Sequence, residues 1–217
     1  MLASPPAVHI GAEDGVWNAE RSLYEFLAGH ARPGVRSLET GLGVSTVLFG
    51  LWRTEHTCVV GDPGQVDRLV AYGQEHGIDL GGVDFAVGYS DQVLPQLDRP
   101  LDLVLIDGGH GYPTPIIDWY YTALNLVVGG IAVVDDTQLP SVRNYLASVL
   151  DADPRWERVA GGARWTAYRK NGAHSVREEW DEQSFLGRAS IRLSTRVKIT
   201  VNRLVPGLRR SLKRFDR

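Results

Sequence analysis

Short apolar runs alternate with longer segments of helical periodicity along most of the chain. The runs predict buried strands, and apolar residues spaced three or four positions apart predict amphipathic helices. The expected strands span residues 35–40, 56–61, 83–88, 101–107 and 130–136, and the expected helices span residues 16–31, 45–53, 65–76, 90–97, 115–127 and 139–150.

Strands that alternate with helices in this way predict parallel βαβ units in a doubly wound sheet with helices on both faces. Residues 155–160 and 163–170, which flank Gly161-Gly162, predict an antiparallel hairpin that closes the sheet. We therefore expect an α/β fold built on a mostly parallel, seven-stranded sheet. This domain is placed at residues 15–170, between an N-terminal segment at 1–14 and a basic C-terminal extension at 171–217.

The composition is that of a globular protein with one core. The 217 residues are 43% hydrophobic and 23% charged, which is ordinary for such proteins. Cys58, the single cysteine, excludes an internal disulfide framework, and its apolar neighbours indicate a buried, unreactive thiol. The N-terminus lacks the pattern of a signal peptide, and the longest apolar stretch, at 123–134, is too short to cross a membrane. We therefore expect a cytoplasmic protein.

The net charge of −3 conceals an uneven distribution. Residues 186–217 carry ten Arg or Lys and one acid, a charge of +9, whereas residues 1–185 carry 13 basic and 25 acidic residues, a charge of −12. An acidic body argues against binding to nucleic acid. The basic C-terminal extension can contact an anionic membrane surface or a partner. Alternatively, it is a solvated tail or packs on the acidic body.

Acidic residues follow four of the predicted strands. Glu39, Asp62, Asp107 and the pair Asp135-Asp136 each come at the end of an apolar run. The carboxyl ends of parallel strands share one rim of the sheet, and ligands bind in the crevice there. We therefore expect these acids to open onto a common binding site.

The turn after the first strand contains Gly41 and Gly43, and such glycines let the backbone approach a ligand. The dinucleotide fingerprint requires a third small residue where Thr46 stands, and Glu39 would repel a pyrophosphate. These features disfavour an NAD-dependent oxidoreductase. The amino-acid end of S-adenosylmethionine, next to a positive sulfonium, suits the turn better. Taken alone, the glycines also fit an ordinary tight turn.

Residues after the second and third strands suit the nucleoside half of that molecule. Asp62 can accept hydrogen bonds from ribose hydroxyls, or it can cap the helix that begins at Pro63. Ser90 and Asp91 can meet the edge of adenine, although Ser90 is also a suitable helix cap. Both interpretations stay open at each position.

Three motifs, VGYSDQVLPQL (87–97), LDLVLIDGGH (101–110) and GGIAVVDDT (129–137), follow one another along the chain. In these motifs the chain resembles the class I S-adenosylmethionine-dependent methyltransferases, and in particular the small-molecule O-methyltransferases that include catechol O-methyltransferase. The resemblance spans about residues 35–137. It implies a Rossmann-like methyltransferase fold, S-adenosylmethionine as methyl donor, a small hydroxylated molecule as acceptor, and a homodimer.

The resemblance also implies roles for individual residues. The acid pair at 135–136 is often Asp-Asn in the family, and the catalytic lysine of the catechol enzyme is replaced here by His110. The implied contacts to S-adenosylmethionine are Glu39, Gly41, Gly43 and Ser45 at the methionine part, Asp62 at the ribose, Ser90 and Asp91 at the adenine, and Asp107; the implied Mg²⁺ ligands are Asp107, Asp135 and Asp136.

Methyl transfer to oxygen needs alignment, a dry site and a deprotonated hydroxyl. Converging carboxylates repel one another unless a cation joins them, and oxygen ligands suit Mg²⁺. His110, with an ordinary pKa of ~6.5, can accept the hydroxyl proton. We therefore expect an O-methyltransferase acting on a phenolic or sugar-containing metabolite, with Asp107 and His110 as catalytic residues. The alternatives are a metal-independent methyltransferase that uses His110 alone and a non-catalytic module that binds S-adenosylmethionine.

Overall fold

The computed structural model describes residues 5–9, 18–173, 178 and 183. The chain divides into two units, Met1–Ser175 and Val176–Arg217, and every described helix and strand lies in the first. The basic C-terminal extension falls almost entirely outside the described residues, so the predicted boundaries at 15 and 170 stay predictions. Within the described part of the chain, no helix has the length and apolar character needed to cross a membrane.

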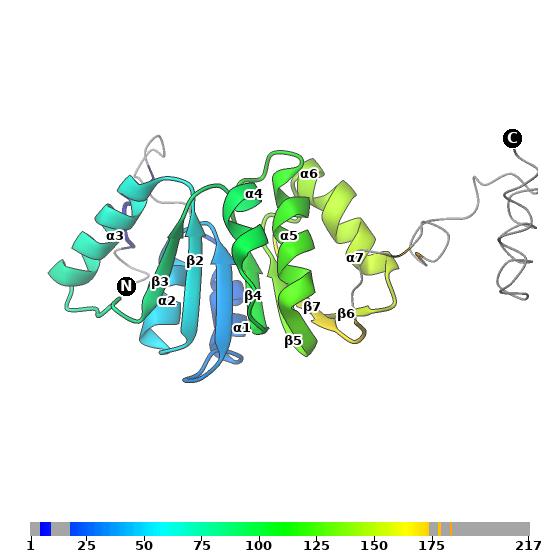
Figure 1. The fold of residues 1–217 in the computed structure, drawn as a ribbon, viewed down its shortest axis with the longest axis horizontal. Helices are drawn as coiled ribbons and strands as arrows, with labels where there is room; N and C mark the ends of the chain where they lie inside the picture. Colours follow the sequence, from blue (N-terminus) through cyan, green and yellow to red (C-terminus); the bar gives the residue numbers. More distant parts are fainter. Residues whose placement is uncertain (1–4, 10–17, 174–177, 179–182, 184–217) are drawn as a thin grey trace, which may run out of the picture. The chain divides into compact units, whose positions relative to one another are not determined.

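One mixed sheet of seven strands forms the centre of the first unit, in the order β3-β2-β1-β4-β5-β7-β6 (Figure 1). The first five strands are parallel, β7 is antiparallel to β5, and β6 is antiparallel to β7. This confirms the predicted α/β fold with a closing hairpin. The strands are β1 Arg36–Thr40, β2 Glu55–Val60, β3 Val83–Val87, β4 Leu101–Ile106, β5 Leu126–Val134, β6 Trp156–Gly161 and β7 Thr166–Lys170.

Helices connect the strands and cover both faces of the sheet (Figure 1). A 3-10 turn, Leu94–Gln96, continues α4, and a π-helical turn, Arg143–Ala147, joins α6 to α7. The helices are α1 Arg21–Ala28, α2 Val44–Leu51, α3 Pro63–Glu75, α4 Ser90–Val93, α5 Thr114–Asn125, α6 Pro140–Val142 and α7 Ser148–Ala152.

The alternation of side chains along each strand decides which helices it contacts. On β4, Leu103 and Leu105 pack in a cluster with residues of α1 and α2, such as Leu23. Val104 and Ile106 point the other way and pack in a cluster with α5 and the α6–α7 segment. Because both faces are covered, β4 is apolar nearly throughout, as expected for a parallel strand at the centre of a sheet.

The end of α5 differs from the sequence-based expectation. The helix was expected to reach residue 127, but it ends at Asn125, and β5 begins at Leu126. The buried Lys170 explains this end, because its Nζ donates hydrogen bonds of 2.6 Å to the carbonyls of Ala123 and Leu126. A positive side chain at a helix C-terminus satisfies carbonyl groups that the helix leaves open.

Candidate functional site

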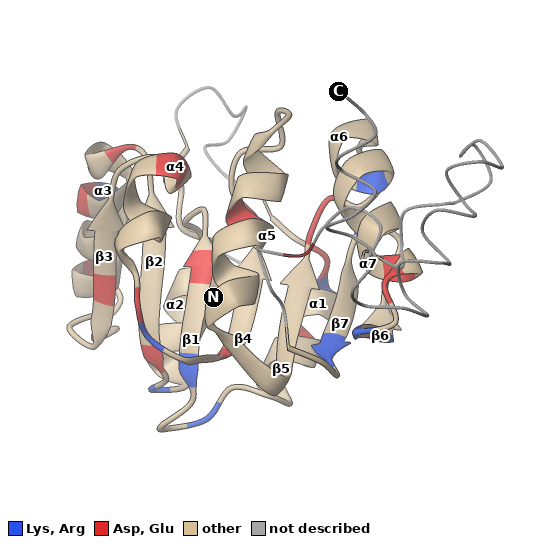
Figure 2. Cartoon of the chain, turned by 45° about the vertical axis from the view of Figure 1, so that its right-hand side comes forward, with Lys and Arg blue, Asp and Glu red and all other residues tan. Residues whose placement is uncertain are grey.

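A cavity of about 1110 Å³ lies at the carboxyl ends of the parallel strands. Figure 2 shows acidic residues at the upper ends of the central strands. Residues that follow these strand ends, such as Asp107 and Asp135, line the cavity. The volume slightly exceeds the usual range of about 300–1,000 Å³ for small-molecule sites. Of the residues predicted from the sequence, the cavity is lined by Gly41, Gly43, Ser45, Ser90, Asp91, Asp107, His110, Asp135 and Asp136.

Two of these acids lie side by side because of the register between β4 and β5. The last residues of the strands, Ile106 and Val134, are direct partners, and the N–H of Asp135 donates to the carbonyl of Ile106 at 3.0 Å. Asp107 and Asp135 are therefore the next residues on adjacent parallel strands, and by alternation both point to the face covered by α1 and α2.

Crowding and burial of the acids disfavour their charged forms. Desolvation, followed by the negative charge of Asp135, holds the pKa of Asp107 well above its usual range. Desolvation also raises the pKa of Asp135 to about 6. Charges of the same sign in a poorly solvated place repel one another unless a proton or a cation compensates them.

The second acid of the pair turns toward His110. Asp136 has a left-handed backbone conformation with φ 52°, which Asp tolerates better than most residues. Its Oδ2 lies 3.0 Å from His110 Nε2, and its Oδ1 accepts a hydrogen bond from Gln138 at 2.8 Å. Burial lowers the pKa of His110, and the charge of Asp136 opposes this effect. A neutral ring that donates from Nε2 to Asp136 leaves Nδ1 free to accept a proton.

The acid and histidine side chains suit a cation. One possible ligand atom from each of Asp107, His110 and Asp136 lies within 4.8 Å of the others. Asp135, which was expected to be a ligand, is outside this group. Its buried Oδ1 nevertheless has no hydrogen-bond partner among the described residues. An unsatisfied carboxylate oxygen beside two further carboxylates fits a hard, oxygen-binding ion.

The glycine turn lies against the loop that carries Asp107. Gly41 has φ +89°, and a Cβ there would overlap the carbonyl oxygen of Asp107, so only glycine allows the two loops to approach so closely. Cys58 Sγ donates to the carbonyl of Gly41 at 3.2 Å, and Thr46 Oγ1 accepts from the N–H of Gly43 at 3.0 Å. Cys58 is fully buried, and burial raises the pKa of its thiol, consistent with an unreactive side chain. Buried side chains on α2 and β2 thus fix the turn.

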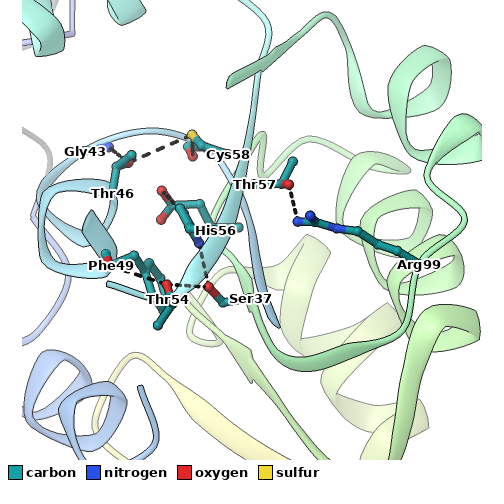
Figure 3. Close-up of polar contacts among 11 residues, drawn as sticks. Ser37, Gly43, Thr46, Phe49, Thr54, His56, Thr57, Cys58 and Arg99 are labelled. Carbon is teal, nitrogen blue, oxygen red and sulfur yellow. Dashed lines mark hydrogen bonds and ion pairs between the residues drawn. The ribbon is translucent and has the colours of Figure 1, made fainter. Parts of the chain in front are cut away.

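Glu39 does not line the cavity. Its Oε1 lies 3.1 Å from Nε2 of His56, and both side chains are buried. His56 also contacts Ser37, with 2.8 Å between Nδ1 and Oγ, and its ring stacks on Phe49 with centroids 4.2 Å apart. Figure 3 shows His56 between the sheet and α2, with Ser37 and Thr54 beside it. Glu39 therefore lies beneath the glycine turn rather than beside a bound donor.

Hydrogen-bond directions define the protonation of this buried pair. Thr54 donates to the carbonyl of Phe49, and Ser37 donates to Thr54. Since Ser37 has only one proton to give, it must accept from Nδ1–H of His56. Nε2 and Glu39 Oε1 then share one further proton, so that the pair as a whole is neutral. A neutral pair is the form that burial favours.

Asp62 also lies outside the cavity lining, as the cap of α3. Its Oδ1 accepts from the N–H of Gly64 at 2.9 Å, and its Oδ2 accepts from Arg68 at 3.1 Å. The side chain is about half exposed. This arrangement is the helix cap that the sequence offered as the alternative to ribose binding.

Several cavity-lining residues were not among the site residues predicted from the sequence; they include Tyr24 on α1, Tyr89 before α4, and Arg164 between β6 and β7. Desolvation raises the pKa values of Asp107 and Asp135, and the positive charge of Arg164 opposes part of this rise. Only the tertiary fold brings Tyr24 and Arg164 to this rim, because Tyr24 belongs to the first helix and Arg164 to the connection before the last strand.

Asp118 on α5 was also missed, because it lies within a segment that predicts an ordinary amphipathic helix. Its side chain is fully buried behind the cavity. Oδ2 accepts from Thr40 Oγ1 at 2.7 Å, whereas Oδ1 has no partner among the described residues. Desolvation raises the pKa of Asp118 to about 6, and the hydrogen bond from Thr40 opposes this rise.

Comparison with known proteins bears on the identity of this domain. Residues 38–137 match the family model described as a methyltransferase domain. No curated protein matches the sequence of the chain. A putative O-methyltransferase from Klebsiella pneumoniae is 18% identical, with a TM-score of 0.61 over 76% of this chain and 85% of that chain.

Two further solved structures share the fold. The O-methyltransferase TomG from Streptomyces achromogenes, involved in tomaymycin synthesis and solved with S-adenosylmethionine, is 17% identical, with a TM-score of 0.57 over 71% of this chain and 82% of that chain. An rRNA methylase from Streptococcus thermophilus is 12% identical, with a TM-score of 0.56 over 72% of this chain and 99% of that chain.

These comparisons confirm the resemblance to class I S-adenosylmethionine-dependent methyltransferases: residues 38–137 match a methyltransferase domain, and the solved structures share the fold. The same fold occurs in enzymes named for oxygen methylation and for rRNA methylation. The fold therefore leaves the acceptor open, and the acceptor has to be argued from the residues of the cavity.

The buried pair of Glu39 and His56 yields a stability prediction. His56→Leu removes the partner of a carboxyl group that is 1% exposed, and breaking a buried pair in this way costs about 3–5 kcal/mol. Urea unfolding should show this loss in the free energy of unfolding. The double variant Glu39→Leu/His56→Leu is expected to recover much of it, because no unpaired charge remains. Losses that simply add in the double variant would contradict the pairing.

Asp118 yields a pH-dependent prediction. Its pKa rises from 3.8 to about 6 on folding, so its stabilising contribution is complete below pH about 4 and is lost as pH rises through about 6. This rise in pKa corresponds to about 3 kcal/mol in the free energy of unfolding. In Asp118→Asn, which keeps an acceptor for Thr40, this loss is absent. The difference in unfolding free energy between wild type and variant should therefore change by about that amount between pH 4 and 7.5. Parallel pH profiles would contradict this assignment.

Proposed function

We propose that the chain is an S-adenosylmethionine-dependent O-methyltransferase that acts on a hydroxyl of a small phenolic or sugar-containing molecule, with Mg²⁺ assistance. One observation supports this most: a single cavity is lined by the glycine turn, by Ser90 and Asp91, and by the cluster of acids with His110. A homodimer, contact of the basic extension with a membrane surface, and a cytoplasmic location stay predictions of the sequence.

The methyl donor is proposed to lie across the ends of β1, β2 and β3. Gly41, Gly43 and Ser45 offer backbone groups to its amino-acid end, while Ser90 and Asp91 face its adenine. Asp62 is proposed to meet the ribose with the lone pairs that Gly64 and Arg68 leave open, since a carboxylate has about four acceptor positions. Glu39 is proposed to act from beneath the turn, through its bond to His56.

The acid cluster is proposed to serve the acceptor hydroxyl. Nδ1 of His110 accepts the hydroxyl proton, a bond forms between the acceptor oxygen and the methyl carbon, and the bond from that carbon to the donor sulfur breaks. The products are the methyl ether and S-adenosylhomocysteine. Asp136 then stabilises the protonated imidazole through the 3.0 Å contact at Nε2. His110 is therefore proposed as the base, and Asp107 as the second catalytic residue next to it.

Asp107, Asp135 and Asp136 are proposed to hold Mg²⁺. The unsatisfied Oδ1 of Asp135 and the raised pKa of Asp107 are the observations in favour of a cation there. When bound, the ion supplies electrostatic stabilisation to the oxygen as its proton leaves. His110 must remain outside the ligand set to act as base, although its ring lies within reach of the same position.

The metal hypothesis predicts that treatment with EDTA reduces turnover of a hydroxylated acceptor by at least about 100-fold, and that Mg²⁺ restores it. Asp107→Asn should lose both turnover and the heat of Mg²⁺ binding in calorimetry. Asp79→Asn, at an exposed turn residue, is the matched control and should retain both. Full activity in EDTA would instead support the metal-independent reaction.

The base hypothesis predicts that His110→Gln lowers kcat by about 10²–10⁴-fold and leaves the affinity for S-adenosylmethionine within about twofold. His76→Gln is the matched control, because His76 is an exposed histidine outside the cavity. The test needs a turnover screen over phenols, catechols and glycosides. Donor binding without turnover of any acceptor would favour the non-catalytic module.

A further inference from the structure

Tyr24 on α1 places a nearly buried hydroxyl at the wall of the cavity. The residue lines the cavity, although its side chain is only 7% exposed. Its oxygen accepts a hydrogen bond of 3.1 Å from the backbone N–H of Ala19. A tyrosine hydroxyl also has one proton to donate, and among the described residues no acceptor lies within hydrogen-bond distance of it. A ligand in the cavity can therefore accept this proton.

The helix that carries Tyr24 lies on the side of the acid cluster. Tyr24 packs in the cluster that includes Leu105 of β4 and Val133 of β5, and α1 lies on the face of the sheet opposite α5 (Figure 1). Asp107 and Asp135 follow these same strands and point to the face that α1 covers. Tyr24 therefore faces the part of the cavity proposed for the methyl acceptor, whereas β2 and β3 pack in a separate cluster with α2 and α3.

Contacts from the closing hairpin hold this segment in place. Trp165 donates from Nε1 to Ser22 Oγ at 2.9 Å, and Arg164 donates from Nη2 to the carbonyl of Asn18 at 2.8 Å. Together with the bond from Ala19, these contacts fix the chain on both sides of the start of α1. A donor that is fixed in this way does not need to reorganise when a charge develops opposite it.

The hydroxyl of Tyr24 stays protonated at neutral pH. Burial raises the pKa of Tyr24, the hydrogen bond from Ala19 opposes this rise, and the charges of Asp107 and Asp135 add to it. The hydroxyl is thus a neutral donor in a cavity with an acidic rim. Such a donor suits a ligand oxygen that becomes negative during the reaction.

We propose that Tyr24 is a catalytic hydrogen-bond donor to the oxygen that receives the methyl group, and that this oxygen belongs to a phenol. The proposal rests on the proposed function, because it assumes that an acceptor hydroxyl is deprotonated by His110. Once that proton has moved to Nδ1, one lone pair of the oxygen forms the bond to the methyl carbon and another accepts the hydrogen bond from Tyr24. The negative charge on the oxygen grows as its proton leaves, so this hydrogen bond is stronger in the transition state than in the bound substrate.

The basicity of the oxygen is the reason for choosing a phenol. A phenolate and a tyrosinate are similar in basicity, so Tyr24 can share its proton with a phenolate and still keep it. The oxygen of a deprotonated sugar hydroxyl is more basic than tyrosinate and would take the proton from Tyr24. That transfer would leave a tyrosinate beside Asp107 and Asp135, which their charges disfavour.

Tyr24→Phe tests the proposal with three acceptors of increasing acidity: phenol, 4-chlorophenol and 4-nitrophenol. The variant is expected to lower kcat/KM for phenol by about 100-fold or more, as for the loss of one donor to a developing oxyanion. For 4-nitrophenol the loss should be about 10-fold or less, because the nitro group withdraws charge from the oxygen and weakens the hydrogen bond. The affinity for S-adenosylhomocysteine, measured by calorimetry, should stay within about twofold of wild type.

Tyr168→Phe is the matched control. Tyr168 is also buried, but its hydroxyl donates to Asp151 at 3.0 Å and it does not line the cavity, so kcat/KM should not change. Tyr24→Phe keeps the ring that packs under α1, and retained binding of S-adenosylhomocysteine shows that the variant folds.

Three results would overturn the proposal. An equal loss for all three phenols would mean that Tyr24 only supports the fold of the segment. A loss of more than about fivefold in affinity for S-adenosylhomocysteine would assign Tyr24 to the methyl donor instead. A wild-type protein that methylates glycosides but no phenol would also contradict it, whereas failure to methylate any hydroxylated acceptor would overturn the proposed function itself.

Discussion

The repulsion between the carboxylates at the ends of β4 and β5 is the constraint on which the site depends. The register of these strands places Asp107 beside Asp135, and the packing of both strands between helices on the two faces fixes that register. The fold thus holds together two carboxylates that would otherwise move apart because their charges repel each other. Arg164 offsets part of the repulsion, and the remainder is available to a cation or to a positively charged ligand.

The same alternation explains why neighbouring residues at the end of β1 have unrelated environments. Leu38 packs in the cluster with α5, so Thr40 points to that face and reaches Asp118. Glu39 points to the opposite face and meets His56 beneath the glycine turn. Glu39 therefore supports the glycine turn through its contact with His56, while Thr40 supports it through its contact with Asp118 on α5.

Much of the fold could be predicted from the sequence, because buried parallel strands have a strong apolar signal and the helices between them have the usual periodicity. The lining positions of Gly41, Ser90, Asp107 and Asp135 followed from the rule that ligands bind at the carboxyl ends of strands. The orientation of Glu39 did not follow, since it depends on a buried partner 17 residues away. Arg164 and Asp118 could not be predicted either, because their relation to the cavity arises only when distant segments pack together.

The electrostatics of the cavity also bear on turnover. If the ligand is a sulfonium donor, the acids Asp107, Asp135 and Asp136 attract it through a charge that vanishes when the methyl group leaves, because the sulfur of the product is neutral. Interactions at Ser90 and the glycine turn are the same before and after transfer, so they hold donor and product alike. In the proposed reaction the acidic rim therefore binds the charged reactant more favourably than the neutral product.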